Sequence, residues 1–192
     1  MKTALYIIFA SLFLLSCSSG GSRGSRGSNG IPSEAPAEDQ NGITTGIKIG
    51  ERAPELVFES PTGEKIALSS LRGKVVLIDF WAAWCSPCRY ENPNLVKTYH
   101  QYKDKDFVNG KGFTIYGVSL DRSKEAWIAA IEKDTLVWES HVSDLKFWQS
   151  AAAAQYGVME IPANFLIDGN GIILAKDLKG EYLDKKLKEF LK

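Results

Sequence analysis

KVVLIDFWAAWCSPCRYENP, residues 74–93, joins a continuous apolar run to two cysteines that stand three positions apart. The run over 74–82 is rich in β-branched and aromatic residues and predicts a strand that is buried on both faces. The residues after it predict a helix over about 86–103, with Pro93 as a kink. Cys85 then lies at the start of this helix, where unpaired backbone N–H groups and the helix dipole favour a thiolate and lower the thiol pKa.

A C-x-x-C pair can be half of a zinc site, a redox dithiol or a structural clip. The chain's two histidines, His100 and His141, stand at no ligand-like spacing, so a zinc site would lack its second pair. A strand-to-helix turn would expose Cys85 and place Cys88 one turn deeper on the same helix face. Pro87 suits an early helical position, which needs no N–H, and it stiffens the loop between the two sulfurs. This arrangement favours a redox pair, while a structural clip remains an alternative.

The N-terminal residues 1–16 predict an export signal, with a positive Lys2 and an apolar run that is shorter than the roughly 20 residues of a membrane span. The end of this segment resembles the lipobox of bacterial lipoproteins, which implies cleavage before Cys17 and lipid attachment to its sulfur. A plain signal peptide with an incidental cysteine is the alternative. With Cys17 lipidated, Cys85 and Cys88 remain as one pair in an extracytoplasmic compartment, where disulfides persist.

Residues 17–46 predict a flexible tether, because this Ser-, Gly- and Pro-rich stretch buries too little apolar surface to order itself. Residues 47–192 have the length of a single folded domain. Ser18 follows the cysteine, which favours the outer membrane by resemblance to the sorting rules of enteric bacteria. Lys plus Arg and Asp plus Glu both number 23, so no basic excess is present to bind phosphates, and a nucleic-acid partner is not expected.

The rest of the domain alternates strand and helix patterns. Two short strands at 55–60 and 64–71 flank the turn Pro61-Thr62-Gly63 and predict an N-terminal hairpin. Further along the chain, the patterns predict a strand at 113–121, a helix at 124–134 capped by Ser123, a helix at 145–155, a hairpin of 163–168 and 172–178, and an amphipathic helix at 181–192. This order predicts an α/β fold with a central mixed β-sheet flanked by helices.

The stretch DFWAAWCSPCR, residues 79–89, resembles the thioredoxin active-site sequence D-F-W-A-x-W-C-G-P-C-K. Three further segments resemble membrane-tethered thioredoxin-like proteins of the TlpA/ResA type: the lead-in at 49–82, GVSLD at 117–121 and GVMEIPANFLIDGNG at 157–171. The resemblance covers nearly all of residues 47–192. It implies a thioredoxin fold, with helices on both faces of the sheet and the extra N-terminal β-hairpin.

The resemblance also implies roles for the residues around the dithiol. Cys85 would attack a target disulfide as the nucleophile, and Cys88 would resolve the mixed disulfide. Asp79 matches the buried acid that takes a proton from the second cysteine, and its position inside an apolar strand predicts a raised pKa. Peroxiredoxin relatives carry T-x-x-C, whereas Ala82-Ala83-Trp84 precedes Cys85 here, so peroxidase activity is not expected.

Substrate contact and redox tuning are assigned in the same way. Pro162 matches a cis proline that faces the dithiol, and Ile161 matches the residue before it, whose backbone pairs with the substrate chain. Trp84 matches the exposed tryptophan beside the nucleophile. Ser86 replaces the thioredoxin glycine, and the dipeptide Ser86-Pro87 occupies the position that tunes the reduction potential in the family.

The sequence therefore predicts an extracytoplasmic, lipid-anchored thiol–disulfide oxidoreductase with no metal and no cofactor beyond the Cys85–Cys88 disulfide. The family resemblance implies reduction of particular envelope-protein disulfides, for instance in cytochrome c maturation, with electrons from a membrane donor of the DsbD/CcdA kind. Two alternatives are a thioredoxin-like copper-delivery protein, although those use C-x-x-x-C and a distant histidine, and an envelope interaction protein with a non-catalytic disulfide.

Overall fold

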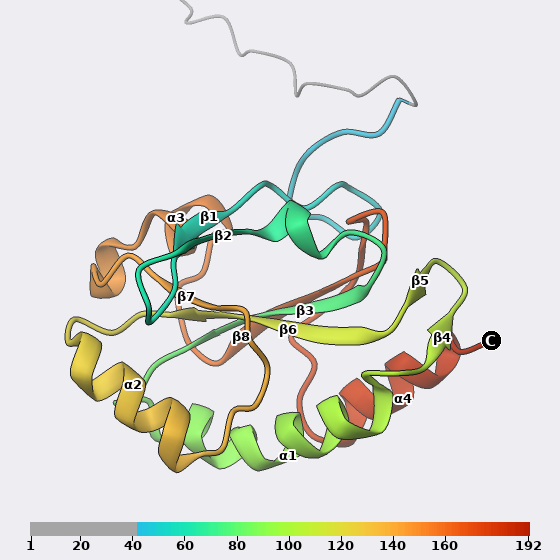
Figure 1. Ribbon diagram of the computed structural model, residues 1–192. Coiled ribbons are helices and arrows are strands. Elements are labelled where there is room, and N and C mark those ends of the chain that lie inside the picture. Colours follow the sequence, from blue (N-terminus) through green and yellow to red (C-terminus); the bar gives the residue numbers. More distant parts are fainter. Residues whose placement is uncertain (1–41) are drawn as a thin grey trace, which may run out of the picture. The chain divides into compact units, whose positions relative to one another are not determined.

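The computed structural model describes residues 42–192, which contain a seven-stranded mixed sheet of strand order β2-β1-β7-β6-β3-β8-β9. The predicted export signal (residues 1–16), Cys17 and most of the predicted tether lie outside the described residues. Figure 1 shows α1, α2 and α4 on one face of the sheet and α3 on the other. The predicted α/β class, with helices on both faces and an added N-terminal hairpin, is confirmed.

The elements follow the predicted alternation in most places. The strands of the main sheet are β1 (Val57–Glu59), β2 (Lys65–Ala67), β3 (Val75–Trp81), β6 (Phe113–Ser119), β7 (His141–Ser143), β8 (Ala163–Ile167) and β9 (Ile173–Lys176). A separate two-stranded ladder joins β4 (Asp106–Phe107) and β5 (Gly110–Lys111). The helices are α1 (Ser86–Tyr102), α2 (Lys124–Lys133), α3 (Ala151–Gln155) and α4 (Glu181–Glu189), with 3-10 turns η1 (Leu68–Leu71) and η2 (Phe147–Gln149).

Strand β3 is a central strand of the sheet and carries the chain into the dithiol. All seven of its residues are buried, as expected for a strand covered by helices on both faces. It pairs in parallel with β6 and antiparallel with β8. Because Trp81 and Ser119 are register partners at the ends of β3 and β6, the two loops that follow these strands lie side by side.

The predicted helix over 145–155 is wrong in its first half. Leu145 and Phe147 have φ angles of 56° and 57°, in the left-handed region that interrupts a right-handed helix. A 3-10 turn follows, and the helix begins only after Ser150, whose hydroxyl accepts the N–H of Ala153. The short strand β7, which adds His141 to the sheet, was not predicted, because three residues form no readable pattern.

Candidate active site

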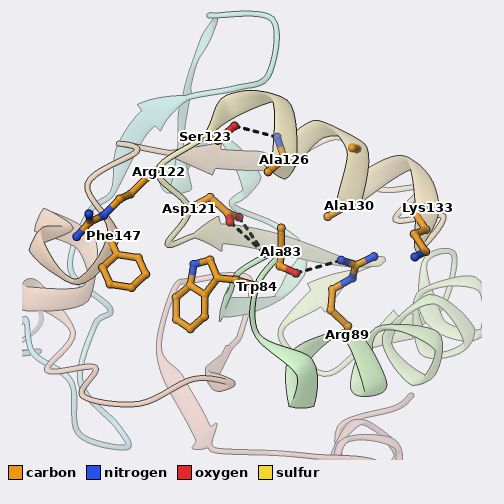
Figure 2. Close-up of a pocket in the computed structure, with 11 residues that line it drawn as sticks. Ala83, Trp84, Arg89, Asp121, Arg122, Ser123, Ala126, Ala130, Lys133 and Phe147 are labelled. Carbon is orange, nitrogen blue, oxygen red and sulfur yellow. Dashed lines mark hydrogen bonds between the residues drawn. The ribbon is translucent and has the colours of Figure 1, made fainter.

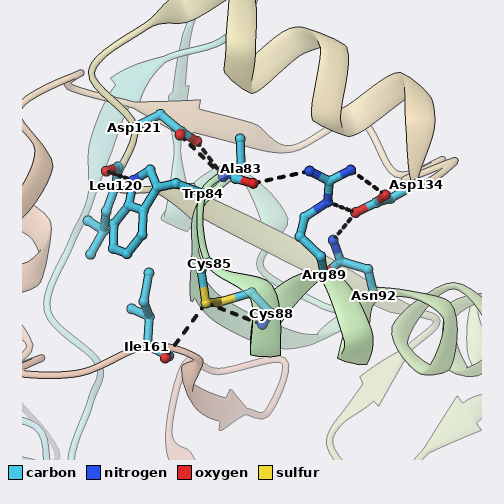
Figure 3. The surroundings of a disulfide bond; sticks show 10 residues. All are labelled: Ala83, Trp84, Cys85, Cys88, Arg89, Asn92, Leu120, Asp121, Asp134 and Ile161. Carbon is cyan, nitrogen blue, oxygen red and sulfur yellow. Dashed lines mark hydrogen bonds and ion pairs between the residues drawn. A yellow bond between two sulfur atoms is a disulfide. The ribbon is translucent and has the colours of Figure 1, made fainter.

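Cys85 and Cys88 form a disulfide at the N-terminus of α1, with their Cα atoms 5.3 Å apart (Figure 3). Cys85 is the N-cap residue, and its sulfur accepts the backbone N–H of Cys88 at 3.2 Å. Ser86 and Pro87 form the first turn between the two sulfurs, so the predicted strand–dithiol–helix arrangement is confirmed. In the reduced protein, the same N–H group and the helix dipole would stabilise a Cys85 thiolate.

The two cysteines are more covered than the sequence predicted. Cys85 keeps 4% of its surface exposed and Cys88 keeps 1%. Cys88 is therefore the more buried of the two, as expected, but Cys85 is not the openly exposed residue that the sequence predicted. Trp84, in contrast, is 45% exposed, as the resemblance implied. Its indole Nε1–H donates to the carbonyl of Leu120 at 3.2 Å, which fixes the ring beside the dithiol (Figure 3).

The segment after α3 brings Ile161 and Pro162 to the dithiol from a distant part of the chain. The peptide bond between them is cis, as the resemblance implied. The carbonyl oxygen of Ile161 lies 3.7 Å from the sulfur of Cys85 (Figure 3). The structure therefore brings this carbonyl to the dithiol, and its backbone pairing to a substrate stays a prediction.

Asp79 lies on β3 and is almost fully buried, with 4% of its surface exposed. Burial, with a smaller contribution from the negative charge of Glu91, raises the pKa of Asp79 from 3.8 to about 7. The predicted rise in this pKa is therefore found, and its main cause is desolvation. A carboxyl group that titrates near pH 7 can exchange protons with a thiol at neutral pH.

Glu91 is a site residue that the sequence reasoning missed. It lies on α1 three positions after Cys88, on the same side of the helix, and its Oε1 accepts the N–H of Gly180 at 2.6 Å. Its charge acts on Asp79 across the space between α1 and β3. The spacing from Cys88 was the available signal, but the partner at Gly180 is visible only in the fold.

A network led by Arg89 joins the active-site helix to α2 (Figure 3). Its guanidinium makes a two-pronged ion pair with Asp134 and also donates to the carbonyl of Ala83 at 3.1 Å. Asn92 donates to the same Asp134 carboxylate at 2.7 Å. Burial alone would raise the pKa of Asp134, but the hydrogen bonds from Arg89 and Asn92 outweigh it and lower that pKa.

Asp121 holds the other side of the loop that precedes the dithiol. Its buried carboxylate accepts the N–H of Ala83, with distances of 3.0 and 3.2 Å to its two oxygens, and the hydroxyl of Ser119 at 2.8 Å. Burial raises the pKa of Asp121, and these hydrogen bonds partly oppose the rise. Ala83 is thus tied through its N–H to Asp121 and through its carbonyl to Arg89, which keeps the backbone before Cys85 in place.

The histidines contribute no metal site. Within residues 42–192, no group of three or more His, Cys, Asp and Glu side chains gathers in a way that could hold a metal ion. His100 is exposed on α1, whereas His141 is buried on β7, stacked on Trp138 with its Nε2 3.2 Å from the carbonyl of Leu136. Burial lowers the pKa of His141 to about 4.

None of the helices within residues 42–192 has the length and apolar character needed to cross a bilayer.

A dithiol at the start of a helix, reached from a central buried strand and faced by a cis proline, defines a thiol–disulfide oxidoreductase of thioredoxin fold. The chain belongs to the AhpC/TSA family, whose family model matches residues 49–176.

Named relatives agree with this assignment. The thiol-disulfide oxidoreductase ResA of Bacillus cereus is 31% identical over 146 residues, which is 76% of this chain and 78% of the relative. The thioredoxin-like protein YneN of Bacillus subtilis is 33% identical over 128 residues, or 67% of this chain and 70% of the relative. The thioredoxin domain of a thiol-disulfide oxidoreductase from Bacteroides vulgatus is 39% identical with a TM-score of 0.68, and the match covers 76% of this chain and 99% of that one. The protein is thus a thiol–disulfide oxidoreductase.

Proposed function

We propose that the protein reduces disulfides of specific envelope proteins outside the cytoplasm, through a mixed disulfide on Cys85. The observation that carries this proposal is the buried Asp79, whose pKa of about 7 suits proton exchange with a thiol. The negative charge of Glu91, which lies on α1 three positions after Cys88, contributes to this rise. The ResA relatives, which are named thiol-disulfide oxidoreductases, support the same class of reaction.

The reaction begins with the reduced protein. The Cys85 thiolate attacks one sulfur of the target disulfide, a new S–S bond forms, and the other target sulfur leaves as a thiolate that takes up a proton. Asp79 then accepts the proton of Cys88, and the Cys88 thiolate attacks the sulfur of Cys85. The mixed S–S bond breaks, and the second target sulfur leaves as a thiolate that takes up a proton. The target leaves with two electrons and two protons gained, and the protein is left with the Cys85–Cys88 disulfide that the structure contains.

A dithiol protein in the membrane, of the DsbD/CcdA kind, would return the two electrons to Cys85 and Cys88. A lipid on Cys17 and the tether of residues 17–46 would hold the domain near such a donor and near its targets, with cytochrome c maturation as the family's example of a use. The sequence resemblances described above support this placement.

Two measurements test the proposal. A reduction potential of the Cys85–Cys88 couple near that of thioredoxin, about −270 mV, is expected for a reductant, whereas a value near −120 mV would indicate an oxidant and contradict the proposal. A Cys88→Ala variant cannot resolve its mixed disulfides, so we expect it to capture target proteins covalently in the cell envelope. The matched Cys85→Ala variant should capture none, because it lacks the nucleophile.

A further inference from the structure

A pocket of about 490 Å³ opens beside the dithiol, between the loop that carries Trp84 and the near face of α2 (Figure 2). Its apolar lining consists of the rings of Trp84 and Phe147, of Ala83, and of three alanines on α2, at positions 126, 129 and 130. The rim carries Arg122 and Lys133, which come from the two ends of the α2 segment. Neither the disulfide chemistry nor the proton exchange at Asp79 uses this pocket.

An aromatic cluster of Trp84, Phe147 and Trp148 lies at one side of the pocket, and the first two of these residues line it. The ring centroid of Trp84 lies 4.9 Å from that of Phe147 and 6.0 Å from that of Trp148. Trp84 is 45% exposed and Trp148 is 41% exposed, although both are large apolar side chains. The left-handed φ angles of Leu145 and Phe147, which disfavour residues with a Cβ, place these rings against Trp84. Exposed apolar rings in a strained segment beside a reactive centre indicate a binding surface.

The charged side chains on the rim of the pocket that make no salt bridge among the described residues, Arg122 and Lys133, are both positive. The Arg122 guanidinium lies 4.5 Å from the centroid of the Phe147 ring. Arg89 is already paired with Asp134. The one acid in the lining, Asp121, accepts hydrogen bonds from the loop backbone and from Ser119. An acidic group on a bound molecule would therefore complement the rim.

We propose that this pocket binds the target polypeptide next to its disulfide, with an apolar side chain between Trp84 and α2 and a neighbouring acidic side chain against Arg122. The inference rests on the proposed function and names the class of target segment that the enzyme prefers. A target whose sulfur is joined to Cys85 lies next to Trp84, the exposed residue before it. An extended chain advances about 3.3 Å per residue, so side chains within a few positions of the target cysteine reach the pocket.

Three synthetic peptides with the same internal disulfide test the inference. They differ only beside one cysteine, where they carry Phe-Glu, Phe-Lys or Gly-Glu. The reduced full chain should reduce the Phe-Glu peptide with a kcat/KM about tenfold above that for either other peptide, because both the apolar contact and the charge pair contribute. Hydroxyethyl disulfide, which is too small to reach the pocket, serves as the reference for the dithiol chemistry.

Substitutions in the pocket test whether a preference among the three peptides arises there. Arg122→Glu should reverse the order of the Phe-Glu and Phe-Lys peptides, because it places like charges together. Ala129→Phe, at an exposed position on α2, should fill the pocket and abolish the advantage of Phe over Gly. Lys111→Glu is the matched charge control, since this exposed lysine on β5 lies at the opposite end of the sheet from α2 (Figure 1), and it should keep the wild-type order.

Different results would contradict the pocket assignment and the proposed function. Equal rates for the three peptides, with hydroxyethyl disulfide reduced normally, would overturn the pocket assignment and leave the reductase intact. A preference that persists unchanged in both Arg122→Glu and Ala129→Phe would also overturn it. A reduced protein that turns over neither the peptides nor hydroxyethyl disulfide would overturn the proposed function and the inference with it.

Discussion

Asp79 is a carboxylic acid inside an apolar strand, and this position links the redox chemistry of the site to the stability of the fold. The unfolded chain loses this proton near pH 3.8, and the folded chain loses it near pH 7. Between these values the folded state holds more protons, so the contribution of Asp79 to stability falls as the pH rises through this window. Asp79 therefore lowers the stability of the fold at neutral pH, and the proposed proton exchange with Cys88 would explain why the site keeps it.

Replacing Asp79 with Asn tests this cost. We expect Asp79→Asn to raise the free energy of unfolding at pH 8 by up to about 4 kcal/mol, the equivalent of the pKa shift, and to leave it nearly unchanged at pH 4. Urea denaturation of the oxidised full chain at pH 4, 6 and 8 measures the difference. A gain of the same size at all three pH values would contradict the explanation, because an uncharged difference does not titrate.

Glu91 adds a second negative charge next to this buried acid. Since its charge raises the pKa of Asp79, Glu91→Gln should lower that pKa and shift the pH dependence of the resolving step to lower pH. Stopped-flow release of a chromophoric thiol target from its mixed disulfide with Cys85, followed from pH 5 to 9, measures the shift. In an Asp79→Asn background the same substitution should no longer move the profile. A profile that shifts equally in both backgrounds would mean that Glu91 acts on the cysteines directly.

Site residues differ in whether the sequence around them was enough to predict them. Cys85 and Cys88 were predicted from their spacing and from the strand and helix patterns on either side of them. The role of Asp79 came from the family resemblance, and only its raised pKa was predicted from its position inside an apolar strand. Pro162 was found only through the family resemblance, since nothing local brings it to the dithiol. Glu91 was missed because its effect depends on partners on other elements, the N–H of Gly180 and the carboxyl group on β3.

At the scale of elements, local patterns predicted the long helices and the buried strands but not the segment between β7 and α3. The helical pattern at 145–155 competes with the left-handed backbone at Leu145 and Phe147 and with ring contacts to Trp84. These tertiary contacts override the local helix preference. The same contacts build a wall of the pocket, so the failed prediction coincides with a candidate binding surface.

The connection between α1 and α2 depends on Asp134. Its pKa is lowered in the folded state, so the ion pair with Arg89 stabilises the protein above the unfolded pKa of 3.8 and is lost as the pH falls below it. We expect Asp134→Asn to lower the free energy of unfolding by about 1–2 kcal/mol at pH 7, with a smaller loss at pH 3. Urea denaturation at the two pH values measures it.

An exposed ion pair provides the comparison for this experiment. Glu181 and Lys185 lie 3.1 Å apart on α4 with side chains that are 70% and 59% exposed. Glu181→Gln should therefore change the stability by less than about 0.5 kcal/mol at either pH. If Asp134→Asn behaves like Glu181→Gln, the network around Arg89 does not hold the two helices together.

At the scale of the whole molecule, the alternation of strands and helices was enough to predict an α/β fold, whereas the order of strands in the sheet was not. The sheet reaches its N-terminal hairpin through β7, which meets β1 at a single register pair, Glu59 and Ser143. A contact of this kind joins residues 84 positions apart and has no local pattern. The resemblance to thioredoxin-like proteins implied the thioredoxin fold, with helices on both faces and an extra hairpin, and the strand order comes from the structure.

The anchor predicted at Cys17 makes the location of the whole chain testable. If lipid on this residue is the attachment, wild-type protein expressed in a bacterium that processes lipoproteins should sediment with membranes and take up labelled palmitate. Cys17→Ala should lose the label, since the thioether that carries the lipid needs the sulfur of Cys17, and without acyl chains the domain has no lipid anchor. Cell fractionation of the wild type and of Cys17→Ala, both with the Cys85–Cys88 pair intact, measures the share of each protein that sediments with membranes. Membrane sedimentation of Cys17→Ala equal to that of the wild type would show that another part of the chain, or a partner, holds the protein at the membrane.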